Sequence, residues 1–333
     1  MTETIKIHGG GLTGLSLAIA LRNRGVPVIL HEAGTYPRHR VCGEFISGIS
    51  RQTIETLGIS EPLEDALRHT DVAWFAGNRL LRENKLPEPA LGISRHLLDN
   101  RLQQLAKGLG AEIRTLSRQH TEPGKPATVR TAGRRPTRGK WIGLKAHVRN
   151  IPTGAHLEMH SGPTGYLGIT PVENGWTNVC GLFRADRSIS ASHRDLLPAY
   201  LRKNGNTALA AALENADWKP DSFTAIAGFA LGLQPPTPGI LALGDSHSII
   251  PPFTGNGMTM AFQSAETALP HLVDYAKAKT NWPTTCERIA HALRSRFQKR
   301  LHAARFLHPL LFRPAARHFL KIAPINPILH LVR

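Results

Sequence analysis

The sequence predicts an α/β fold with a parallel sheet assembled from discontinuous segments and an inserted domain built on an antiparallel sheet. Three observations support this prediction. A strand, a helix and a second strand follow one another over residues 4–32, successive strands fill residues 141–183, and a buried strand returns from residue 239. A strand–helix–strand unit begins a parallel sheet, whereas strands joined by tight turns form an antiparallel one.

Hydrophobic periodicity places the individual elements. For the parallel sheet we expect strands over residues 4–8, 26–32, 112–116 and 239–243, with helices over residues 12–24, 97–109 and from about residue 257. For the second sheet we expect strands over residues 141–148, 155–160, 165–171 and 176–183, then helices over residues 192–203 and 207–214. Glu173-Asn174-Gly175 is a hairpin-turn signal. The stretch 121–138 is rich in proline, glycine and arginine and is predicted to form a loop or hairpin tip.

Composition limits the class of protein. The chain has 333 residues, enough for about two domains, and its 41% hydrophobic and 20% charged content is typical of a globular protein. Cys42, Cys180 and Cys286 are far apart and lack metal-type spacing, which favours a reducing compartment and predicts no metal site. We expect a cytoplasmic protein, because the early apolar strand leaves no room for a signal peptide and no apolar run is long enough to span a membrane.

A glycine motif joins the first predicted strand to the first predicted helix. In Gly9-Gly10-Gly11-Leu12-Thr13-Gly14, the residues Gly9, Gly11 and Gly14 have the G-x-G-x-x-G spacing. This spacing permits a tight turn, close approach of a pyrophosphate, and packing of the helix on the strand. Glu32 ends the second strand, where a carboxylate can hold a ribose diol. The sequence therefore predicts a Rossmann-like site for FAD or NAD that includes Leu12 and Thr13, with a merely glycine-rich turn as the alternative.

A second motif favours FAD. Gly244-Asp245 follows the strand at residues 239–243, and Pro251-Pro252-Phe253-Thr254-Gly255-Asn256-Gly257-Met258 precedes the next helix. These residues resemble the second FAD signature of the para-hydroxybenzoate hydroxylase and geranylgeranyl reductase families. The resemblance implies that Asp245 binds the ribityl or pyrophosphate part of FAD. It also implies that the pyrimidine edge of the flavin faces the following residues: Pro252, Gly255, Gly257 and Met258. The alternative is a strand–loop–helix unit with a capping aspartate.

Two further segments carry the same resemblance. Tyr36-Pro37-Arg38-His39-Arg40-Val41-Cys42-Gly43-Glu44 resembles the P-x-x-[KR]-x-C-G-E segment of geranylgeranyl-reductase-like flavoproteins. Ile93-Ser94-Arg95-His96-Leu97-Leu98-Asp99 resembles the segment whose arginine lies near the ribityl chain and phosphates. The resemblance thus adds Arg40, Cys42 and Arg95 to the FAD site.

The resemblance also implies the domain organisation. The FAD-binding domain is expected to comprise residues 1–70, 92–138 and 236–282, and the substrate domain residues 71–91 and 139–235. Residues 283–333 are expected to form a C-terminal basic amphipathic helical region.

The sequence departs from these families at two places. Where they carry an Ala-Asp-Gly element for pyrophosphate and NAD(P)H, this chain has Ala132-Gly133-Arg134-Arg135. NADH or NADPH is still the expected electron donor, and the two arginines are either phosphate contacts or part of a solvated basic loop. At Tyr166-Leu167-Gly168-Ile169-Thr170-Pro171 the reductases have the aromatic Y-x-W-x-F-P element. Gly168 and Thr170 therefore predict a differently shaped cavity, and the missing tryptophan disfavours halogenation.

The flavin carries the difficult chemistry in this class, so no side-chain triad is expected. Candidate catalytic residues are Cys42 and Glu44, by resemblance, together with Tyr166 and His247. Each also has a structural alternative: a small buried thiol for Cys42, a buried strand tyrosine for Tyr166, and a structural histidine for His247.

The net charge of +17 is concentrated in two regions. Residues 114–149 contain ten Lys/Arg against one acid, and residues 288–333 contain ten and no acid. In the second region, apolar residues recur every four positions at Ile289, Leu293, Phe297 and Leu301. This pattern predicts either a helix lying on an anionic membrane surface or a stripe that packs on the flavin domain. No nucleic-acid-binding motif accompanies the charge, so no nucleic-acid partner is expected.

Three functions fit these observations. The first is an FAD-dependent monooxygenase that hydroxylates an aromatic or polyketide-like, lipophilic small molecule through a flavin hydroperoxide. The second is a flavin-dependent ene-reductase acting on an isoprenoid or other lipid double bond. The third is a non-catalytic flavin-binding or membrane-docking protein.

Overall fold

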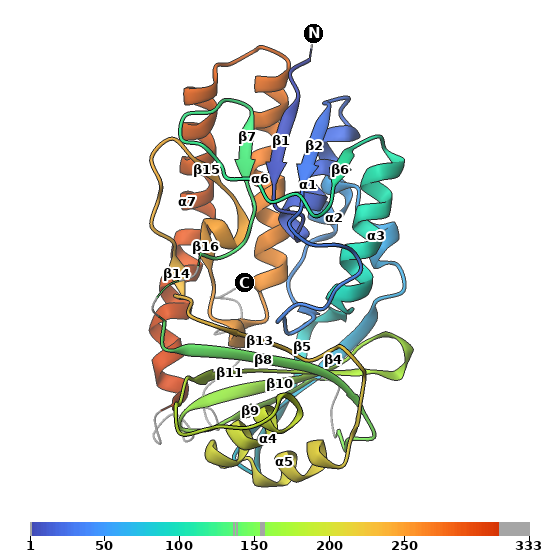
Figure 1. Ribbon diagram of the computed structural model, residues 1–333, viewed down its shortest axis with the longest axis vertical. Helices are drawn as coiled ribbons and strands as arrows, with labels where there is room; N and C mark the ends of the chain where they lie inside the picture. Colours follow the sequence, from blue (N-terminus) through green and yellow to red (C-terminus); the bar gives the residue numbers. More distant parts are fainter. Residues whose placement is uncertain (1, 136, 138, 154–156, 313–333) are drawn as a thin grey trace.

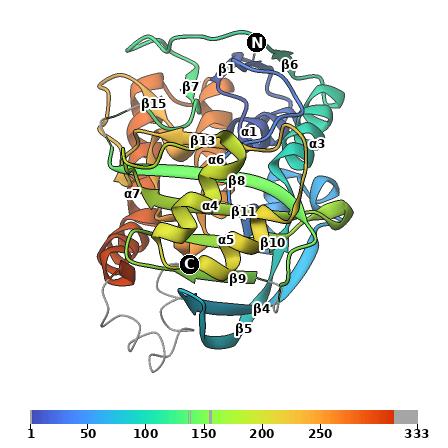
Figure 2. The ribbon, with the colours of Figure 1, turned by 60° about the horizontal axis from the view of Figure 1, so that its bottom comes forward.

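The computed structural model describes residues 2–135, 137, 139–153 and 157–312 and has the mixed α/β architecture expected from the sequence. Figure 1 shows a parallel sheet with its helices above a second, strongly twisted sheet. Helices α4 (His193–Lys203) and α5 (Thr207–Glu214) cover the far face of this second sheet, as Figure 2 shows. The parallel sheet and its helices therefore form one half of the molecule, and the second sheet with α4 and α5 forms the other.

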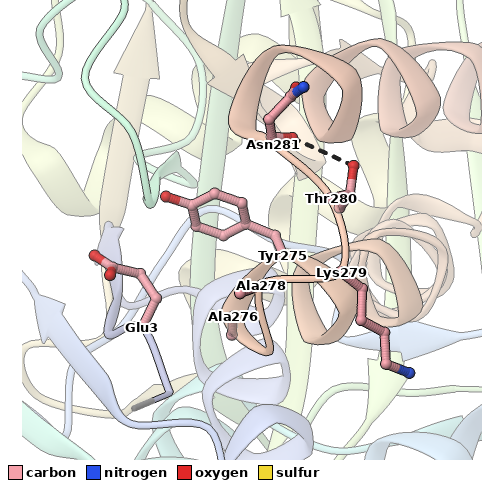
Figure 3. A pocket seen from close by; sticks show the side chains of 7 residues that line it. All are labelled: Glu3, Tyr275, Ala276, Ala278, Lys279, Thr280 and Asn281. Atoms are coloured by element: carbon pink, nitrogen blue, oxygen red, sulfur yellow. Dashed lines mark hydrogen bonds between the residues drawn. The ribbon is translucent and has the colours of Figure 1, made fainter.

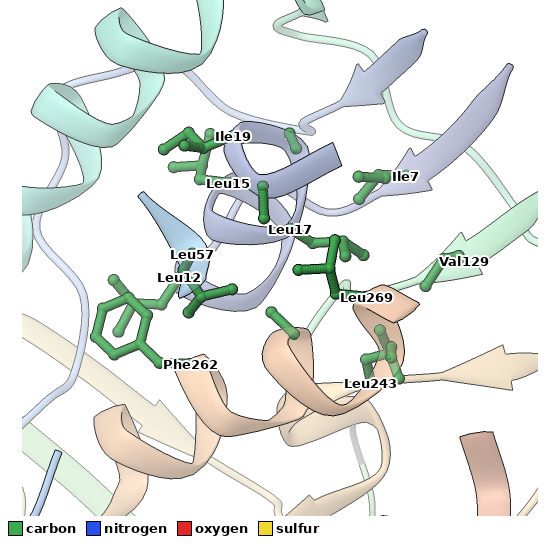
Figure 4. Packing of buried hydrophobic residues seen from close by; sticks show 14 of the residues in the cluster. Ile7, Leu12, Leu15, Leu17, Ile19, Leu57, Val129, Leu243, Phe262 and Leu269 are labelled. Carbon is green, nitrogen blue, oxygen red and sulfur yellow. The ribbon is translucent and has the colours of Figure 1, made fainter. Parts of the chain in front are cut away.

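The parallel sheet has five strands in the order β15–β7–β1–β2–β6, and all neighbours are parallel. The strands are β1 (Ile5–His8), β2 (Val28–His31), β6 (Glu112–Arg114), β7 (Thr128–Arg130) and β15 (Leu241–Ala242). The helices around it are α1 (Leu12–Arg22), α2 (Arg51–Leu57), α3 (Arg95–Gly108), α6 (Gly257–Ala276) and α7 (Trp282–Leu307). One hydrophobic core joins these elements; Ile7, Leu15, Val129 and Phe262 all lie in it (Figure 4).

Strand β7 corrects the prediction of a loop or hairpin tip over residues 121–138. Residues 128–130 pair with β1 on one side and with β15 on the other, and Val129 is fully buried. A three-residue strand is too short to show a periodic pattern, and the surrounding prolines, glycines and arginines hide it. Its position is determined by the two strands that pair with it.

The second sheet has nine strands, mostly antiparallel, with β9 and β4 as its parallel pair. Along the main path its order is β12 (Asp217–Trp218), β8 (Trp141–Arg149), β11 (Thr177–Arg184), β10 (Gly165–Pro171), β9 (Leu157–Ser161), β4 (Leu67–Ala76), β5 (Arg79–Gly92) and β3 (Phe45–Ile46), and β13 (Thr224–Ala227) also pairs with β8. The predicted turn at residues 173–175 is present as a single 3₁₀ turn between β10 and β11. A small third sheet pairs β14 (Gly232–Leu233) with β16 (Ser248–Ile249).

The two faces of the nine-stranded sheet differ in character. On β8, Leu144, Ala146 and Val148 pack against α4 and α5 in a second hydrophobic core. Because side chains alternate along a strand, Lys145 and His147 point to the opposite face, toward the parallel-sheet half of the molecule. We call this the inner face. Cys180 and Gly168 share it, since Lys145 pairs with Cys180 and Cys180 with Gly168.

The C-terminal basic region begins as helix α7, which packs along α6. Its apolar stripe is buried, with Ile289, Leu293, Phe297 and Leu301 no more than 6% exposed. Of the two alternatives for this stripe, the structure therefore has the packed one. The basic and apolar residues expected beyond Phe312 lie outside the described residues. Within the described ranges, no helix combines the length and apolar content needed to cross a bilayer.

Candidate functional site

The sequence motifs meet at the carboxyl edge of the parallel sheet. The glycine motif follows β1, Glu32 follows β2, the Gly133–Arg135 segment follows β7, and Asp245 follows β15. Ligands of open α/β sheets bind outside this edge, because the loops that leave the strands converge there. Segments more than 200 residues apart in the chain are thereby brought side by side: Thr13 Oγ1 donates to the carbonyl of Ala261, for example.

The glycine motif is closely packed on one side and open on the other. Gly9 has φ +118°, and a Cβ there would lie 2.5 Å from the backbone of Ala132. A Cβ on Gly14 would overlap the carbonyl oxygen of Gly9. At Gly11, in contrast, the nearest described atom would be Arg95 Nη2 at 3.9 Å. Gly9 and Gly14 are therefore required by the fold, whereas Gly11 leaves room for a ligand close to the backbone.

Two helices begin at this edge without a side-chain cap. Neither Gly11, before α1, nor Asn256, before α6, caps its helix through a side chain. Helices α3 and α7 are capped in the usual way, by Ser94 and Asn281. Free N–H groups and the positive end of the helix dipole at α1 and α6 can therefore be used by an anionic or polar ligand.

Glu32 is deeply buried and fully engaged by donors. Its Oε2 accepts from Gly10 N–H (2.8 Å) and Arg40 (3.4 Å), and its Oε1 accepts from Gly34 N–H (2.9 Å) and Arg38 (2.7 Å). Burial raises the pKa of this carboxyl, but the Gly34 N–H, both arginines and the Gly10 N–H outweigh burial, so the net pKa is lowered. A carboxylate has about four acceptor positions. A ribose diol would therefore have to replace one arginine on Glu32.

Arg95 and Arg40 converge on one buried carboxylate. Arg95 forms a bidentate pair with Asp99 (2.7 and 2.8 Å), and Arg40 Nε donates to the same group (2.9 Å). Asp99 has no exposed surface. The aspartate thus fixes Arg95, which lies on the open side of Gly11, and ties Arg40 to the carbonyl of Gly10 (3.3 Å). Asp99 was not among the predicted site residues, although its i, i+4 spacing from Arg95 on a helix was a usable signal.

Asp245 lies on the opposite side of the same opening. The preceding Gly244 has φ +59° and is packed against Thr13, so only glycine fits there. The Asp245 side chain is exposed, yet surrounding protein raises its pKa by desolvation, and Arg95 and Arg134 partly offset this. A carboxyl that is accessible but poorly hydrated is typical of an opening that binds a ligand rather than of the outer surface.

The Pro252–Gly257 turn joins the parallel-sheet half to the inner face. Gly255 adopts φ +68° against Phe45, and Thr259 Oγ1 donates to the carbonyl of Ser47 (2.7 Å). The Phe253 N–H donates to the hydroxyl of Tyr166 (3.2 Å), so Tyr166 supports this turn from β10. Pro252 and Gly257 are exposed, and Met258 is buried behind them.

The inner face has an open strip opposite this turn. Among the described atoms, a Cβ on Gly168 would lie within 4 Å only of the carbonyl oxygens of Cys180 and Glu158, both at 3.9 Å. Cys180 is partly exposed, and at Gly43 no described atom lies within 4 Å of where a Cβ would stand. Gly168 therefore leaves space at the point where the sequence predicts a differently shaped cavity.

An aromatic cluster bounds one end of this strip. Tyr166 stacks on Phe312 (ring centroids 6.1 Å apart) and packs edge-on against His308 (5.9 Å). Trp141 and Phe253 complete the cluster around the same two residues. His308 and Phe312 belong to the 3₁₀ segment after α7, so the described C-terminal end of the chain forms part of this wall.

A buried ionic cluster bounds the other end. Glu44 Oε2 lies 2.5 Å from His147 Nε2, and Glu44 Oε1 lies 3.3 Å from Lys145 Nζ. Glu44 and Lys145 have no exposed surface, and the backbone of Glu44 adopts φ +54°. The lowered pKa of Glu44 arises because the bonds to His147 and Lys145 outweigh burial, which alone would raise it.

Of the four candidate catalytic residues, the structure places Cys42, Glu44 and Tyr166 around the strip. Burial raises the pKa of the Cys42 thiol, and Arg95 offsets this only in part. His247 lies elsewhere: its Nδ1 contacts Ser248 (3.1 Å), and its charged neighbour is Arg294 of α7. Burial, with the help of Arg294, lowers the pKa of His247.

Four residues of this site were not predicted from the sequence: Lys145, His147, Asn178 and Gly10. Lys145 and His147 alternate with apolar residues in a strand, and two ionisable groups on one face of a buried strand were the available signal. Gly10 has a structural role, because a Cβ there would overlap the Tyr36 hydroxyl.

Comparisons of the whole chain give a consistent result. No family model and no curated sequence matches the chain. Solved structures do match: the flavin-dependent brominase Bmp2 has a TM-score of 0.78 at 17% identity, covering 99% of this chain and 93% of that one. The chain therefore shares the fold of this flavin-dependent protein. PqsL, a probable FAD-dependent monooxygenase from Pseudomonas aeruginosa, has a TM-score of 0.74 at 15% identity, covering 97% of this chain and 100% of its own. FqzB has a TM-score of 0.76 at 18% identity, covering 97% and 87%.

The residues at the carboxyl edge fit FAD. The uncapped start of α1 and the open side of Gly11 suit a pyrophosphate, with Arg95 as the adjacent cation. The uncapped start of α6 at Gly257 suits the electron-rich edge of a flavin, since no described atom lies within 4 Å of a Cβ there. Among the described residues, Glu32 would have to give up one arginine contact to hold the ribose diol.

A separate pocket lies far from these residues. It has a volume of about 500 Å³ and is lined by Glu3, Tyr275, Ala276, Ala278, Lys279, Thr280 and Asn281 (Figure 3). It opens at the carboxyl end of α6, and the 20 residues of that helix span about 30 Å. The pocket is therefore not part of the candidate site. In the described part of the chain, no three metal-ligating side chains come together.

Proposed function

We propose that this chain is an FAD-dependent monooxygenase that hydroxylates an aromatic or polyketide-like, lipophilic small molecule. The open strip at Gly168 and Cys180 carries the proposal, because it faces the turn at Pro252–Gly257 and is bounded by the cluster around Tyr166. An apolar, aromatic-lined space beside a cofactor edge suits a planar lipophilic substrate.

In this proposal, the chemistry that bound FAD would supply is acceptance of a hydride from NADH or NADPH and activation of oxygen. The chain's own residues hold and orient it: the Gly9–Gly14 loop and Arg95 at the pyrophosphate, Asp245 at the ribityl chain, and the start of α6 at the flavin. The overall reaction converts substrate, oxygen, NAD(P)H and a proton into hydroxylated product, NAD(P)⁺ and water. One oxygen atom enters the product and the other leaves as water.

Arg134 supports the proposed use of a nicotinamide donor. It directly follows Ala132-Gly133, the stretch in which the families that this chain resembles carry an aspartate, and its guanidinium carbon lies 5.5 Å from the ring centroid of Phe229. Asp245 interacts with it electrostatically. Burial lowers the pKa of Arg134, and Asp245 opposes this. A guanidinium held in this way can bind a phosphate of the donor.

An ene-reductase is the second candidate. The observation that favours it is the Cys42-Gly43-Glu44 segment beside the strip, which resembles that of geranylgeranyl-reductase-like proteins. In that case the flavin would reduce a double bond, and oxygen would not be consumed in proportion to product.

The test begins with purified protein. Yellow protein with bound FAD that is bleached anaerobically by NADH or NADPH is expected. A panel of phenols and polyketide-like aromatics is then supplied with ¹⁸O₂, and oxygen uptake is compared with ¹⁸O in the product. One labelled atom per product molecule supports the monooxygenase. Reduction of a lipid double bond without oxygen uptake favours the reductase, and protein unable to bind FAD contradicts both.

A further inference from the structure

The ionic cluster behind the strip is built from β8 and the segment that joins β2 to β3. Glu44 precedes β3, Lys145 and His147 lie on β8, and His39 follows β2, with Lys145 Nζ 3.0 Å from His39 Nδ1. The ring of His39 stacks on His96, at the start of α3 (centroids 4.6 Å). Removing a carboxylate and an ammonium from water costs several kcal/mol per ion, and the positive φ of Glu44 adds strain. Such costs are concentrated at functional sites.

Glu44 determines which nitrogen of His147 carries a proton. The Glu44 carboxylate accepts from Nε2 at 2.5 Å, so Nε2 is protonated. One carboxylate and one ammonium compensate each other, and a neutral His147 leaves the cluster without net charge. Nδ1 then carries a lone pair and is the atom able to take up a proton. A carboxylate orients the histidine base of many hydrolases in the same way.

Two buried polar atoms next to this cluster are unpaired. Neither His147 Nδ1 nor Asn178 Oδ1 has a hydrogen-bond partner among the described residues. The two residues are directly opposite each other on β8 and β11. His147 N–H donates to Ser222 Oγ and its carbonyl accepts from Lys219, so its backbone faces away from β11. In such a non-hydrogen-bonded pair the side chains are close together, so a ligand with two donor groups can contact both.

We propose that His147 is the catalytic base of this protein, taking a proton at Nδ1 from the phenol or enol hydroxyl of the bound substrate. Glu44 is a positioning residue. Asn178, which lies beside His147, is fixed by donation from Nδ2 to the Cys42 carbonyl (3.1 Å). The inference rests on the proposed hydroxylation, since loss of the O–H proton makes the ring a better nucleophile. The accessible positions Cys180 and Gly43 adjoin Asn178 and Glu44.

The cluster also stabilises the positive charge that His147 gains with the proton. As the substrate O–H bond breaks, the His147 Nδ1–H bond forms, and the Glu44 carboxylate that accepts from Nε2 faces the resulting imidazolium. One bond is broken and one is formed. Burial, with Lys145, His147 and His96, lowers the pKa of His39 to about 3. His39 therefore stays neutral beside Lys145 and does not compete with His147 for the proton.

Charged and titratable groups from each adjoining element also face the ionic cluster. Arg95 of α3 donates its backbone N–H to Glu44 (2.9 Å), Cys42 accepts from the Glu44 N–H (3.4 Å), and Cys180 is opposite Lys145. Beside His39, the pKa of His96 is lowered by burial, Lys219 and Lys145, and Glu173 opposes this shift.

The first experiment measures the tautomer of His147 in FAD-loaded protein by NMR of ¹⁵N-labelled histidine. The expected result at neutral pH is a protonated Nε2 and a free Nδ1. The double variant E44Q/K145M removes both charges and so keeps the cluster neutral. Its new side-chain amide at position 44 can donate to Nε2, and the tautomer should reverse. The proposal would be overturned if His147 of the wild-type protein carried its proton on Nδ1, or if the tautomer did not reverse in the double variant.

The second experiment uses 4-nitrophenol, whose phenolate absorbs visible light, as a probe of the proton transfer itself. We expect wild-type protein to bind it as the phenolate and His147→Gln to bind that form at least about tenfold more weakly, as for loss of one charge-assisted hydrogen bond. His160→Gln is the matched control, because His160 pairs with Glu158 (2.8 Å) away from the cluster. Equal phenolate binding by wild type and His147→Gln, or no binding by wild type, would overturn the proposal.

These readouts require no turnover. Failure to consume oxygen would therefore contradict the proposed function. The tautomer and 4-nitrophenol results would still test the role of His147 independently.

Discussion

A single hydroxyl restricts the second position of the glycine motif, Gly10, to glycine. Tyr36 donates to the carbonyl of Gly10 (2.6 Å), and the Gly10 N–H in turn donates to Glu32. Burial, Glu32 and Asp99 all raise the pKa of Tyr36, so it remains a neutral donor. The turn is therefore held by contacts from β2 and the following loop as well as by its own glycines.

Gly10→Ala is expected to destabilise the protein by about 1–3 kcal/mol, because the new methyl group displaces the Tyr36 hydroxyl. Tyr36→Phe alone should cost about 1 kcal/mol for the lost hydrogen bond. The double variant should be more stable than the sum of the two costs predicts, because the phenyl ring leaves room for the methyl. Urea denaturation of the four proteins measures this, and strict additivity would contradict it.

Two glycines on opposite faces of one strand pair should respond in opposite ways. Gly168→Trp fills the open strip and should lower affinity for an aromatic substrate at least about tenfold, with FAD binding and stability nearly unchanged. Gly181→Ala should instead destabilise, because its Cβ would overlap the ring of Phe183 in the core against α4 and α5. Substrate titration and thermal unfolding of both variants test this; substrate binding unaffected by the tryptophan substitution would place the substrate elsewhere.

At the scale of the element, helix α7 shows why an amphipathic pattern alone does not identify a membrane surface. A basic face beside an apolar stripe fits a lipid interface and a protein core equally well. Here the stripe completes the core shared by β1, α1 and α6. The deciding information is the partner of the stripe, which lies elsewhere in the chain.

Phe297→Ala is expected to destabilise the protein by about 3–5 kcal/mol, because the residue is 1% exposed and a cavity would remain. Arg294→Ala, on the exposed side of the same helix, is the control and should change stability by less than about 0.5 kcal/mol. Urea unfolding gives both values. A loss below about 1 kcal/mol for Phe297→Ala would mean that the stripe is not packed in solution.

The elements that the sequence predicted well are those with a local signal. The first strand and helix, the strands around residues 141–183 and helices α4 and α5 all show regular periodicity or a recognisable turn. Strand β7 lacks such a signal and exists because β1 and β15 pair with it on both sides. The same limit applies to the site: motif residues were identified, whereas the Glu44–His147 and Arg95–Asp99 pairs depend on chain segments meeting in space.

At the scale of the molecule, buried histidines should make stability sensitive to mild acid. Burial, then His31, lowers the pKa of His8 to about 4, and burial, then Arg184, lowers that of His308 to about 4. Their unfolded pKa is near 6.5, so below that pH the unfolded state takes up protons first and stability falls until about pH 4. Glu32 and Glu44, with lowered pKa values, lose their stabilising contribution only at lower pH.

We expect unfolding free energy to be flat above about pH 7 and to fall by at most about 3 kcal/mol per histidine between about pH 6.5 and 4. His8→Asn and His308→Gln should each flatten this slope. Urea denaturation across the pH range measures it, with His120→Asn at an exposed position as the control. A wild-type curve that stays level to pH 4 would show that these histidines are protonated in the folded state.

The inner face of the nine-stranded sheet has a consequence for the geometry of any reaction beside it. Its Trp141–Tyr166 end is aromatic, its Lys145–His147 end is ionic, and Gly168 and Cys180 lie between them. An amphiphilic molecule bound on this face would have one favourable orientation, with its acidic group toward α3 and its apolar part toward α7. Reversal would bury the acidic group among aromatic rings and the apolar part among charges. The sheet would thereby select which carbon atom meets the flavin, so regiochemistry would follow from the polarity gradient rather than from a tight steric fit.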